Sequence, residues 1–403
     1  MVRLRKVTQS MDAPSPARKR CRIAAAAVLA CAALPGPAAA QKAAARAPAP
    51  PTSTYWVYVG AESADLIQRV RFGPGGAAVE KTIAVGQSPV EMEGPHGLQI
   101  SRDGQWLHMT TGHGSPDGKY WRYALGPDTL ASPGLFLGYF PASLDVTPDG
   151  LYAFVANFNL HGEMVPSSIS VVYTPTSTEV ARTTTCTMPH GSRIDPTGTH
   201  QYSTCMMDDQ LVEIDTRTFE VSRRFGVAKG NEGPIDPAAT GHAHQHTPGQ
   251  PMAPATCSPT WAQPSADGRK IYVTCNKADE ILEIDRDAWA VSRRFTTGRG
   301  PYNLAVTPNG KLLVASLKQG GSVQVFDLAA GASVFLTKSS TTVTHGVVIS
   351  PDSRYAFVSS EGVGAAPGKV DIYDLNALVR VASVDVGQQA GGIAFWKMEA
   401  AGR

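Results

Sequence analysis

The chain has 403 residues, with 36 lysines and arginines against 34 aspartates and glutamates, and six cysteines. This near balance of charge, without a basic stripe, excludes nucleic acid as an expected partner. The length allows two ordinary domains or one large repeat domain.

Residues 1–40 are predicted to form a secretory signal peptide. Basic residues precede an alanine-rich apolar run at 23–34, and small residues at Ala38 and Ala40 form an Ala-x-Ala cleavage site. The apolar run is too short to span a bilayer. We therefore expect a periplasmic or secreted mature chain without a transmembrane segment, which begins with an alanine- and proline-rich tether at 41–53.

Two alternatives remain open for the leader. Translation could start at Met11, or a lipoprotein signal could end at Cys31 in "VLAC". Cleavage after Ala40 would remove seven basic residues and one acidic residue, which leaves 29 against 33 and a net charge of −4.

One structural unit repeats throughout residues 54–398. Each unit has an anchor triplet, an apolar strand, a turn such as "TPDG" (147–150), a second strand and two outer strands. The central residues of the anchors lie 46, 48, 70, 42, 43 and 46 positions apart. The anchors are "PHG" (95–97), "PAS" (141–143), "PHG" (189–191), "PTW" (259–261), "PYN" (301–303), "THG" (344–346) and "AGG" (390–392). Seven units of about four short strands predict an all-β fold, a seven-bladed β-propeller.

The two ends of the chain are predicted to build one blade together. The segment "GGIAFWKM" (391–398) has the pattern of an innermost strand, and 55–60, 66–72 and 79–86 have the pattern of three outer strands. Joining them completes the seventh blade and leaves no open sheet edge.

Two segments carry a resemblance to a known repeat. "RKIYVTCNKADEILEID" (269–285) and "GLYAFVANFN" (150–159) resemble the YVTN-type β-propeller repeat. The resemblance covers nearly all of 54–398 and implies the propeller fold. It implies no particular activity, because propellers host many functions.

Eight of the ten histidines are expected on one face of the propeller. This is the face on which the innermost strands start and the second strands end, and we call it the histidine face. The eight are His96, His113, His161, His190, His242, His244, His246 and His345. Three of them, His96, His190 and His345, are central anchor residues of blades 1, 3 and 6, so we expect their imidazoles to converge.

An insertion at about 231–258 is predicted between blades 3 and 4. "LVEIDTRTFEVSRRF" (211–225) recurs as "ILEIDRDAWAVSRRF" (281–295) at an offset of 70, longer than the other spacings. The insertion contains "TGHAHQHTPG", in which His242, His244 and His246 are candidate extra metal ligands or parts of a lid. The alternative is a polar loop without a specific role.

The converging imidazoles predict a transition-metal site. Neutral imidazoles from separate elements are suitable metal ligands, and we assign them to His96, His190 and His345, with His113 as an additional ligand. Methionines expected on the same face favour copper: Met92, Met164, Met188, Met206, Met207 and Met252. The alternative is that each anchor histidine bonds neighbouring backbone and only shapes the channel mouth.

The anchor triplets carry a second resemblance. "PHG" at His96 and His190 and "THG" at His345 resemble the anchors of the propeller of nitrous oxide reductase, whose channel histidines hold copper. The resemblance implies copper and redox chemistry, but it is limited to the triplets and the repeat. Because Ala142, Thr260, Tyr302 and Gly391 occupy the other anchors, we expect a mononuclear site.

Four cysteines remain in the mature chain and lie in adjacent blades. They are predicted to form two disulfides, Cys186–Cys205 and Cys257–Cys275; the alternative is that they are thiolate ligands beside His190.

Two functions follow from these features. The first is a metal-dependent oxidoreductase that acts on a small molecule. The second is a non-enzymatic scaffold that binds a protein or small ligand on the histidine face, with Tyr302 and Trp261 in contact.

Overall fold

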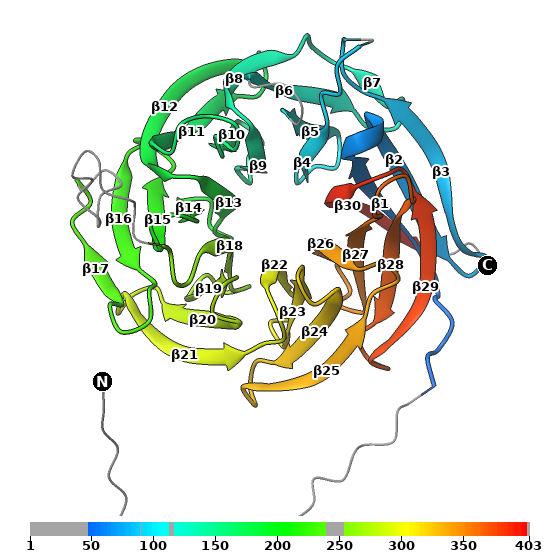
Figure 1. Ribbon diagram of the computed structural model, residues 1–403. Helices are drawn as coiled ribbons and strands as arrows, with labels where there is room; N and C mark the ends of the chain where they lie inside the picture. Colours follow the sequence, from blue (N-terminus) through cyan, green and yellow to red (C-terminus); the bar gives the residue numbers. More distant parts are fainter. Residues whose placement is uncertain (1–46, 89, 113–116, 239–253, 401–403) are drawn as a thin grey trace, which may run out of the picture. The chain divides into compact units, whose positions relative to one another are not determined.

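The computed structural model describes residues 47–88, 90–112, 117–238 and 254–400, which all belong to one compact unit, Ala45–Arg403. Within this part of the chain, seven antiparallel sheets form a ring (Figure 1). The predicted seven-bladed β-propeller is therefore confirmed. Among the same residues, no helix is long and apolar enough to cross a membrane.

Blades 1 to 4 follow one another along the chain. Blade 1 contains β4 (Pro95–Ile100), β5 (Trp106–Thr111), β6 (Asp117–Ala124), β7 (Thr129–Leu130) and β8 (Leu135–Tyr139). Blade 2 contains β9 (Pro141–Val146), β10 (Tyr152–Asn157), β11 (Pro166–Tyr173) and β12 (Thr178–Thr187). Blade 3 contains β13 (Pro189–Ile194), β14 (His200–Cys205), β15 (Gln210–Asp215), β16 (Val221–Gly226) and β17 (Gly233–Ile235). Blade 4 contains β18 (Pro259–Pro264), β19 (Lys270–Cys275), β20 (Glu280–Asp285) and β21 (Ala290–Thr296).

Blades 5 to 7 complete the ring. Blade 5 contains β22 (Pro301–Val306), β23 (Leu312–Leu317), β24 (Ser322–Asp327) and β25 (Ala332–Lys338). Blade 6 contains β26 (Val343–Ile349), β27 (Tyr355–Glu361), β28 (Gly368–Asp374) and β29 (Val379–Val386). Blade 7 contains β30 (Ala390–Ala400), β1 (Ser53–Ala61), β2 (Leu66–Gly73) and β3 (Gly76–Ala84), and the short 3-10 helix η1 (Glu62–Ala64) follows β1.

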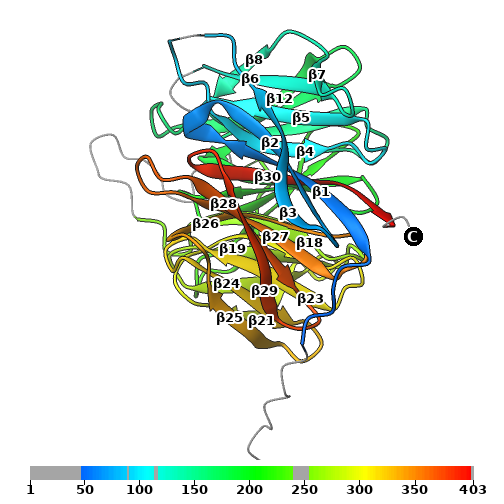
Figure 2. The same ribbon diagram turned by 90° about the vertical axis from the view of Figure 1, so that its right-hand side faces the viewer.

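Both ends of the propeller contribute to blade 7, as the sequence predicted. Strand β30 is innermost and pairs antiparallel with β1, with Val57 opposite Phe395 (Figure 2). Blades 1 and 3 depart from the predicted four strands. Strand β8 pairs with β6 beside the short β7, and residues 233–235 of the insertion pair with β16.

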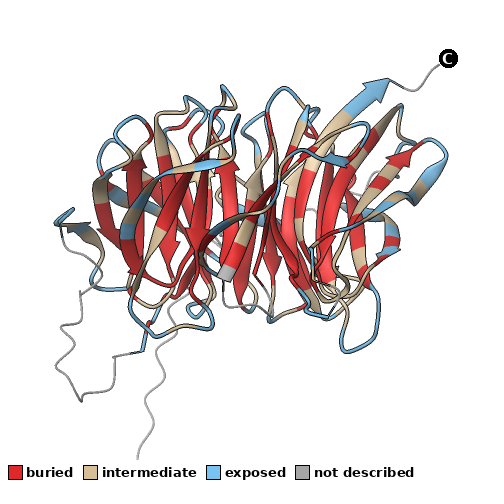
Figure 3. Cartoon of the chain, turned by 90° about the horizontal axis from the view of Figure 1, so that it is seen from above, coloured by how far each residue is buried: buried red, intermediate tan, exposed pale blue. Residues whose placement is uncertain are grey.

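Burial falls from the inner strands to the outer strands of a blade. Strand β19 is buried at every position after its first residue, whereas the outer strand β25 has no fully buried position. Inner strands lie between two neighbouring blades and need apolar side chains on both faces, while outer strands meet solvent. The buried residues accordingly lie along the strands, and exposed residues lie mainly in the connecting loops (Figure 3).

Each innermost strand has a β-bulge directly after the first anchor residue. In blade 3, Pro189 pairs with Cys205 but Ser192 pairs with Ser203, so β13 advances three residues while β14 advances two. The same shift occurs in all seven sheets. In five blades the residue after the central anchor residue donates its N–H to a hydroxyl of the second strand: Gly97, Gly191, Trp261, Asn303 and Gly346. A bulge re-aims side chains, and here it directs the central anchor residues to the channel.

Two disulfides tie incoming segments to the second strands of blades 3 and 4. Cys186 is bonded to Cys205, and Cys257 is bonded to Cys275. These are the two disulfides predicted from the sequence, so none of the four sulfurs is a thiolate here. Such bonds are typical of proteins from oxidising compartments.

Removing either disulfide is expected to lower the free energy of unfolding by roughly 3 kcal/mol, because each bond closes a short loop. The paired cysteines are 19 and 18 positions apart. Urea unfolding of the double variants Cys186→Ala/Cys205→Ala and Cys257→Ala/Cys275→Ala measures this loss, with the reduced wild type as the matched control. A loss below about 0.5 kcal/mol for both variants would contradict the expectation.

Candidate functional site

A pocket of about 490 Å³ opens at the histidine face, where the seven blades meet. Two layers of side chains line it. The first layer consists of central anchor residues: His96, His190, Thr260, Tyr302 and His345. The second layer lies at the ends of the second strands. In each blade concerned, one residue of the second strand pairs with the first anchor residue, and the residue that follows it lines the pocket. These residues are Glu62, Phe158, Met206, Asn276, Lys318 and Glu361.

Hydrogen bonds between neighbouring blades fix the first layer. His96 Nδ1 donates to the carbonyl of Ala142 at 2.6 Å, and His190 Nδ1 donates to the carbonyl of Thr260 at 2.8 Å. Thr260 Oγ1 in turn donates to the carbonyl of Tyr302 at 2.7 Å. Each of these three side chains thus donates to the carbonyl of the central anchor residue of the next blade. For His96 and His190, this bond places the proton on Nδ1 and leaves the lone pair on Nε2.

His345 of blade 6 stands in the same relation to Gly391 of blade 7. Burial and the charge of Lys318 lower the pKa of His345, and the nearby Gly391 carbonyl opposes this lowering, although His345 Nδ1 forms no hydrogen bond of good geometry. The position of the Gly391 carbonyl repeats the arrangement at the other two histidines.

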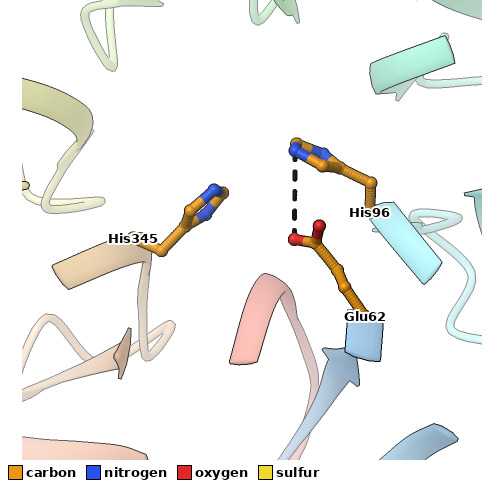
Figure 4. A group of neighbouring side chains, drawn as sticks. All are labelled: Glu62, His96 and His345. Atoms are coloured by element: carbon orange, nitrogen blue, oxygen red, sulfur yellow. Dashed lines mark ion pairs between the residues drawn. The ribbon is translucent and has the colours of Figure 1, made fainter. Parts of the chain in front are cut away.

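Glu62 completes a cluster with two of the anchor histidines. One ligand atom each from Glu62, His96 and His345 lies within 4.8 Å of the others, and all three residues are buried. Figure 4 shows the three side chains pointing toward one another, with Glu62 Oε1 3.9 Å from His96 Nε2. The carboxylate has room because blade 7 has glycine at its anchor: a Cβ on Gly391 would lie 2.0 Å from Glu62 Oε1.

His190 lies outside this cluster and has a different partner. The hydroxyl of Tyr302 lies 2.9 Å from His190 Nε2. Because His190 Nδ1 carries the proton, Tyr302 is the donor in this bond. The rings of His96 and His190 are 6.2 Å apart at their centroids, against 5.4 Å for His96 and His345.

An ion pair between Lys318 and Glu361 lies beside the cluster. Lys318 Nζ is 2.9 Å from Glu361 Oε1 and 4.5 Å from the centre of the Tyr302 ring. Burial alone would lower the pKa of Lys318, but Tyr302 and Glu361 raise it overall, so the ammonium stays charged. Burial also raises the pKa of Tyr302 to about 12.

The anchor histidines are neutral. Burial, assisted by the charge of Lys318, lowers the pKa of His96 to about 4. Burial together with His96 lowers the pKa of His190 to about 3, and burial together with Lys318 lowers that of His345 well below its usual value. Neutral imidazole is the form that binds metal ions.

The opposite wall of the pocket is apolar. Phe140, Phe158, Leu160 and Met206 line it from blades 2 and 3. The pocket therefore has a polar side on blades 5 to 7 and an apolar side across from it, an arrangement typical of small-molecule sites.

The remaining site residues predicted from the sequence lie partly at the pocket and partly elsewhere. His113, His242, His244 and His246 lie outside the described residues. His161 packs against the ring of Phe140 at the pocket wall. Tyr302 lines the pocket, whereas Trp261 lines a smaller cavity of about 20 Å³ with Arg193 stacked on its ring.

Sequence reasoning missed Glu62, Lys318 and Glu361. All three follow a recognisable signal, because each lies just beyond the second-strand residue that pairs with the first anchor residue. Applying the anchor spacing to the second strands, and not only to the first, would have found them.

No family model matches the chain, and no curated protein matches it. The structure is similar to a periplasmic gluconolactonase of Pseudomonas aeruginosa, with a TM-score of 0.64 and 17% identity over 85% of this chain and 99% of that one. It is also similar to hydrazine synthase of Kuenenia stuttgartiensis, with a TM-score of 0.55 and 17% identity over 76% of this chain and 91% of that one. At this identity the likeness supports the fold alone. The resemblances to the YVTN-type repeat and to nitrous oxide reductase stay predictions.

The neutral histidines predict a loss of stability in mild acid. Unfolded histidine takes up a proton near its usual pKa, whereas the folded anchor histidines do not, so the unfolding free energy falls as pH drops below about 6.5. Each contributes up to about 1.4 kcal/mol per pH unit. Urea unfolding of metal-free protein from pH 6.5 to 5.0 measures this slope, and His190→Gln should reduce it.

His200→Gln is the matched control for this slope. Asp195 raises the pKa of His200, so the contribution of His200 is lost as pH rises and is constant below 6.5. The control should keep the wild-type slope, and a His190→Gln variant with the wild-type slope would contradict the assignment of a neutral His190.

Proposed function

We propose that this pocket binds one divalent transition-metal ion through His96, His345 and Glu62 and presents it to a small molecule. The observation that carries the proposal is the convergence of three buried ligand atoms within 4.8 Å of one another. Imidazoles bound to one ion at metal–nitrogen distances of about 2.0–2.1 Å have ring centres roughly 4.5–5.5 Å apart. The His96–His345 separation of 5.4 Å falls in this range.

The surrounding groups support metal binding. The Nδ1–H of His96 is held by a backbone carbonyl, the usual outer partner of a metal-binding imidazole, which leaves Nε2 for the ion. Lys318 Nζ pairs with Glu361 at 2.9 Å, and Glu62 contributes a buried carboxylate oxygen to the cluster.

The ligands of the proposed site favour other metals over the copper that was predicted from the sequence. Copper was favoured by methionines, but of that set only Met206 lines the pocket among the described residues. Two imidazoles and one carboxylate are typical of catalytic zinc and of iron(II) sites with open coordination positions. We therefore propose zinc or iron(II) ahead of copper. Iron(II) or copper would support oxidoreductase chemistry, and zinc would activate a water.

Metal analysis tests the proposal on the exported, mature protein, purified without a histidine tag. We expect one transition-metal ion per chain by mass spectrometry. His96→Ala, His345→Ala and Glu62→Gln should each lose it, because each removes one ligand. His200→Ala, on the opposite face, should keep it. Protein without metal that also fails to take up zinc, iron(II) or copper would instead favour the scaffold alternative, in which the pocket binds its ligand without an ion.

Gly391→Ala tests the position of Glu62 without removing any ligand. The new methyl group would occupy the place of the carboxylate, so we expect metal affinity to fall by about 10- to 100-fold. Isothermal titration with zinc measures the change. The double variant Glu62→Gln/Gly391→Ala should be no weaker than Glu62→Gln, because both act through one side chain. Additive losses would show that Gly391 acts by another route.

A further inference from the structure

His190 differs from the other two anchor histidines in what its Nε2 atom contacts. Within the described residues, His190 is the only one of the three whose Nε2 accepts a hydrogen bond, which comes from the Tyr302 hydroxyl at 2.9 Å. The proton of His190 is on Nδ1, which donates to the Thr260 carbonyl, so its lone pair is directed to Tyr302.

Tyr302 is held by hydrogen bonds to its backbone and by packing of its ring. Its backbone carbonyl accepts hydrogen bonds from Thr260 Oγ1 at 2.7 Å and from Thr274 Oγ1 at 3.1 Å. Its ring lies under the Lys318 ammonium and packs on His345, with ring centres 4.8 Å apart. The bond to His190 is therefore part of a fixed network.

Without this hydroxyl, His190 would be close enough to join the metal site. Its ring centre is 6.2 Å from that of His96, only roughly 1 Å beyond the separation expected for two imidazoles on one ion. A buried lone pair without a partner is costly, so His190 would gain by binding the ion.

We infer that Tyr302 determines the ligand number of the proposed metal site. By donating to His190 Nε2, it withholds a third imidazole, so the ion is bound by two imidazoles and one carboxylate. Coordination positions on the side of His190 and Tyr302 then stay open, next to the apolar wall formed by Phe158 and Met206. The inference rests on the proposed function and assigns to Tyr302 a positioning role that acts through His190.

Copper(II) is the probe for counting imidazoles, because pulsed electron paramagnetic resonance detects the remote nitrogen of each bound ring. We expect two imidazoles in the wild type, three in Tyr302→Phe and two again in Tyr302→Phe/His190→Ala. The copper(II) affinity of Tyr302→Phe should rise by about tenfold through the added ligand. His190→Ala alone should keep two imidazoles and an affinity within about twofold of the wild type, and it serves as a second test should Tyr302→Phe fail to fold.

Tyr120→Phe is the matched control. Tyr120 hydroxyl and His108 Nδ1 form a similar buried pair at 2.6 Å, between β5 and β6, and neither residue lines the pocket. The pulsed electron paramagnetic resonance spectrum of copper(II)-loaded Tyr120→Phe should equal that of the wild type. Three imidazoles in the wild type, or two in folded Tyr302→Phe, would overturn the role of Tyr302 while leaving the metal site intact. Failure of all variants and of the wild type to bind copper(II) would overturn both proposals.

Discussion

The hydrogen bond from an anchor side chain to the backbone of the next blade is the interaction on which the site depends. It joins neighbouring blades and also sets which nitrogen of the imidazole faces the pocket. His96 and His190 each use Nδ1 in this way. A histidine that bonds backbone at the channel mouth can therefore also bind a metal ion, because its two ring nitrogens have different partners.

The bulge at the start of each innermost strand explains why this bond recurs. It is present in every sheet, whatever the anchor residue, so the backbone offers seven equivalent positions around the channel. Chemistry then depends on which side chain occupies each position. Glycine at 391 leaves room for the carboxylate of Glu62, which directly follows β1, and the hydroxyl of Tyr302 bonds His190 two blades away.

The repeat was predictable from the sequence, and so were the closure of the ring and the face of the histidines. These depend on periodic apolar strands and on turn spacing, which are local properties. Anchor spacing applied to the second strands would place Glu62 near the channel, but it does not reveal which channel residues form the cluster, because that depends on contacts between blades. The carboxylate of Glu62 occupies space that a side chain at Gly391, more than 300 residues away, would otherwise fill. His190 is drawn to Tyr302 by a hydrogen bond that no spacing in the sequence reveals.

Anomalous X-ray diffraction at the absorption edge of the metal, on crystals of protein purified without a histidine tag, locates the ion directly. We predict one strong peak at about 2.0–2.2 Å from His96 Nε2, His345 Nε2 and a carboxylate oxygen of Glu62. A metal peak elsewhere on the protein, with these three side chains unbound, would contradict it.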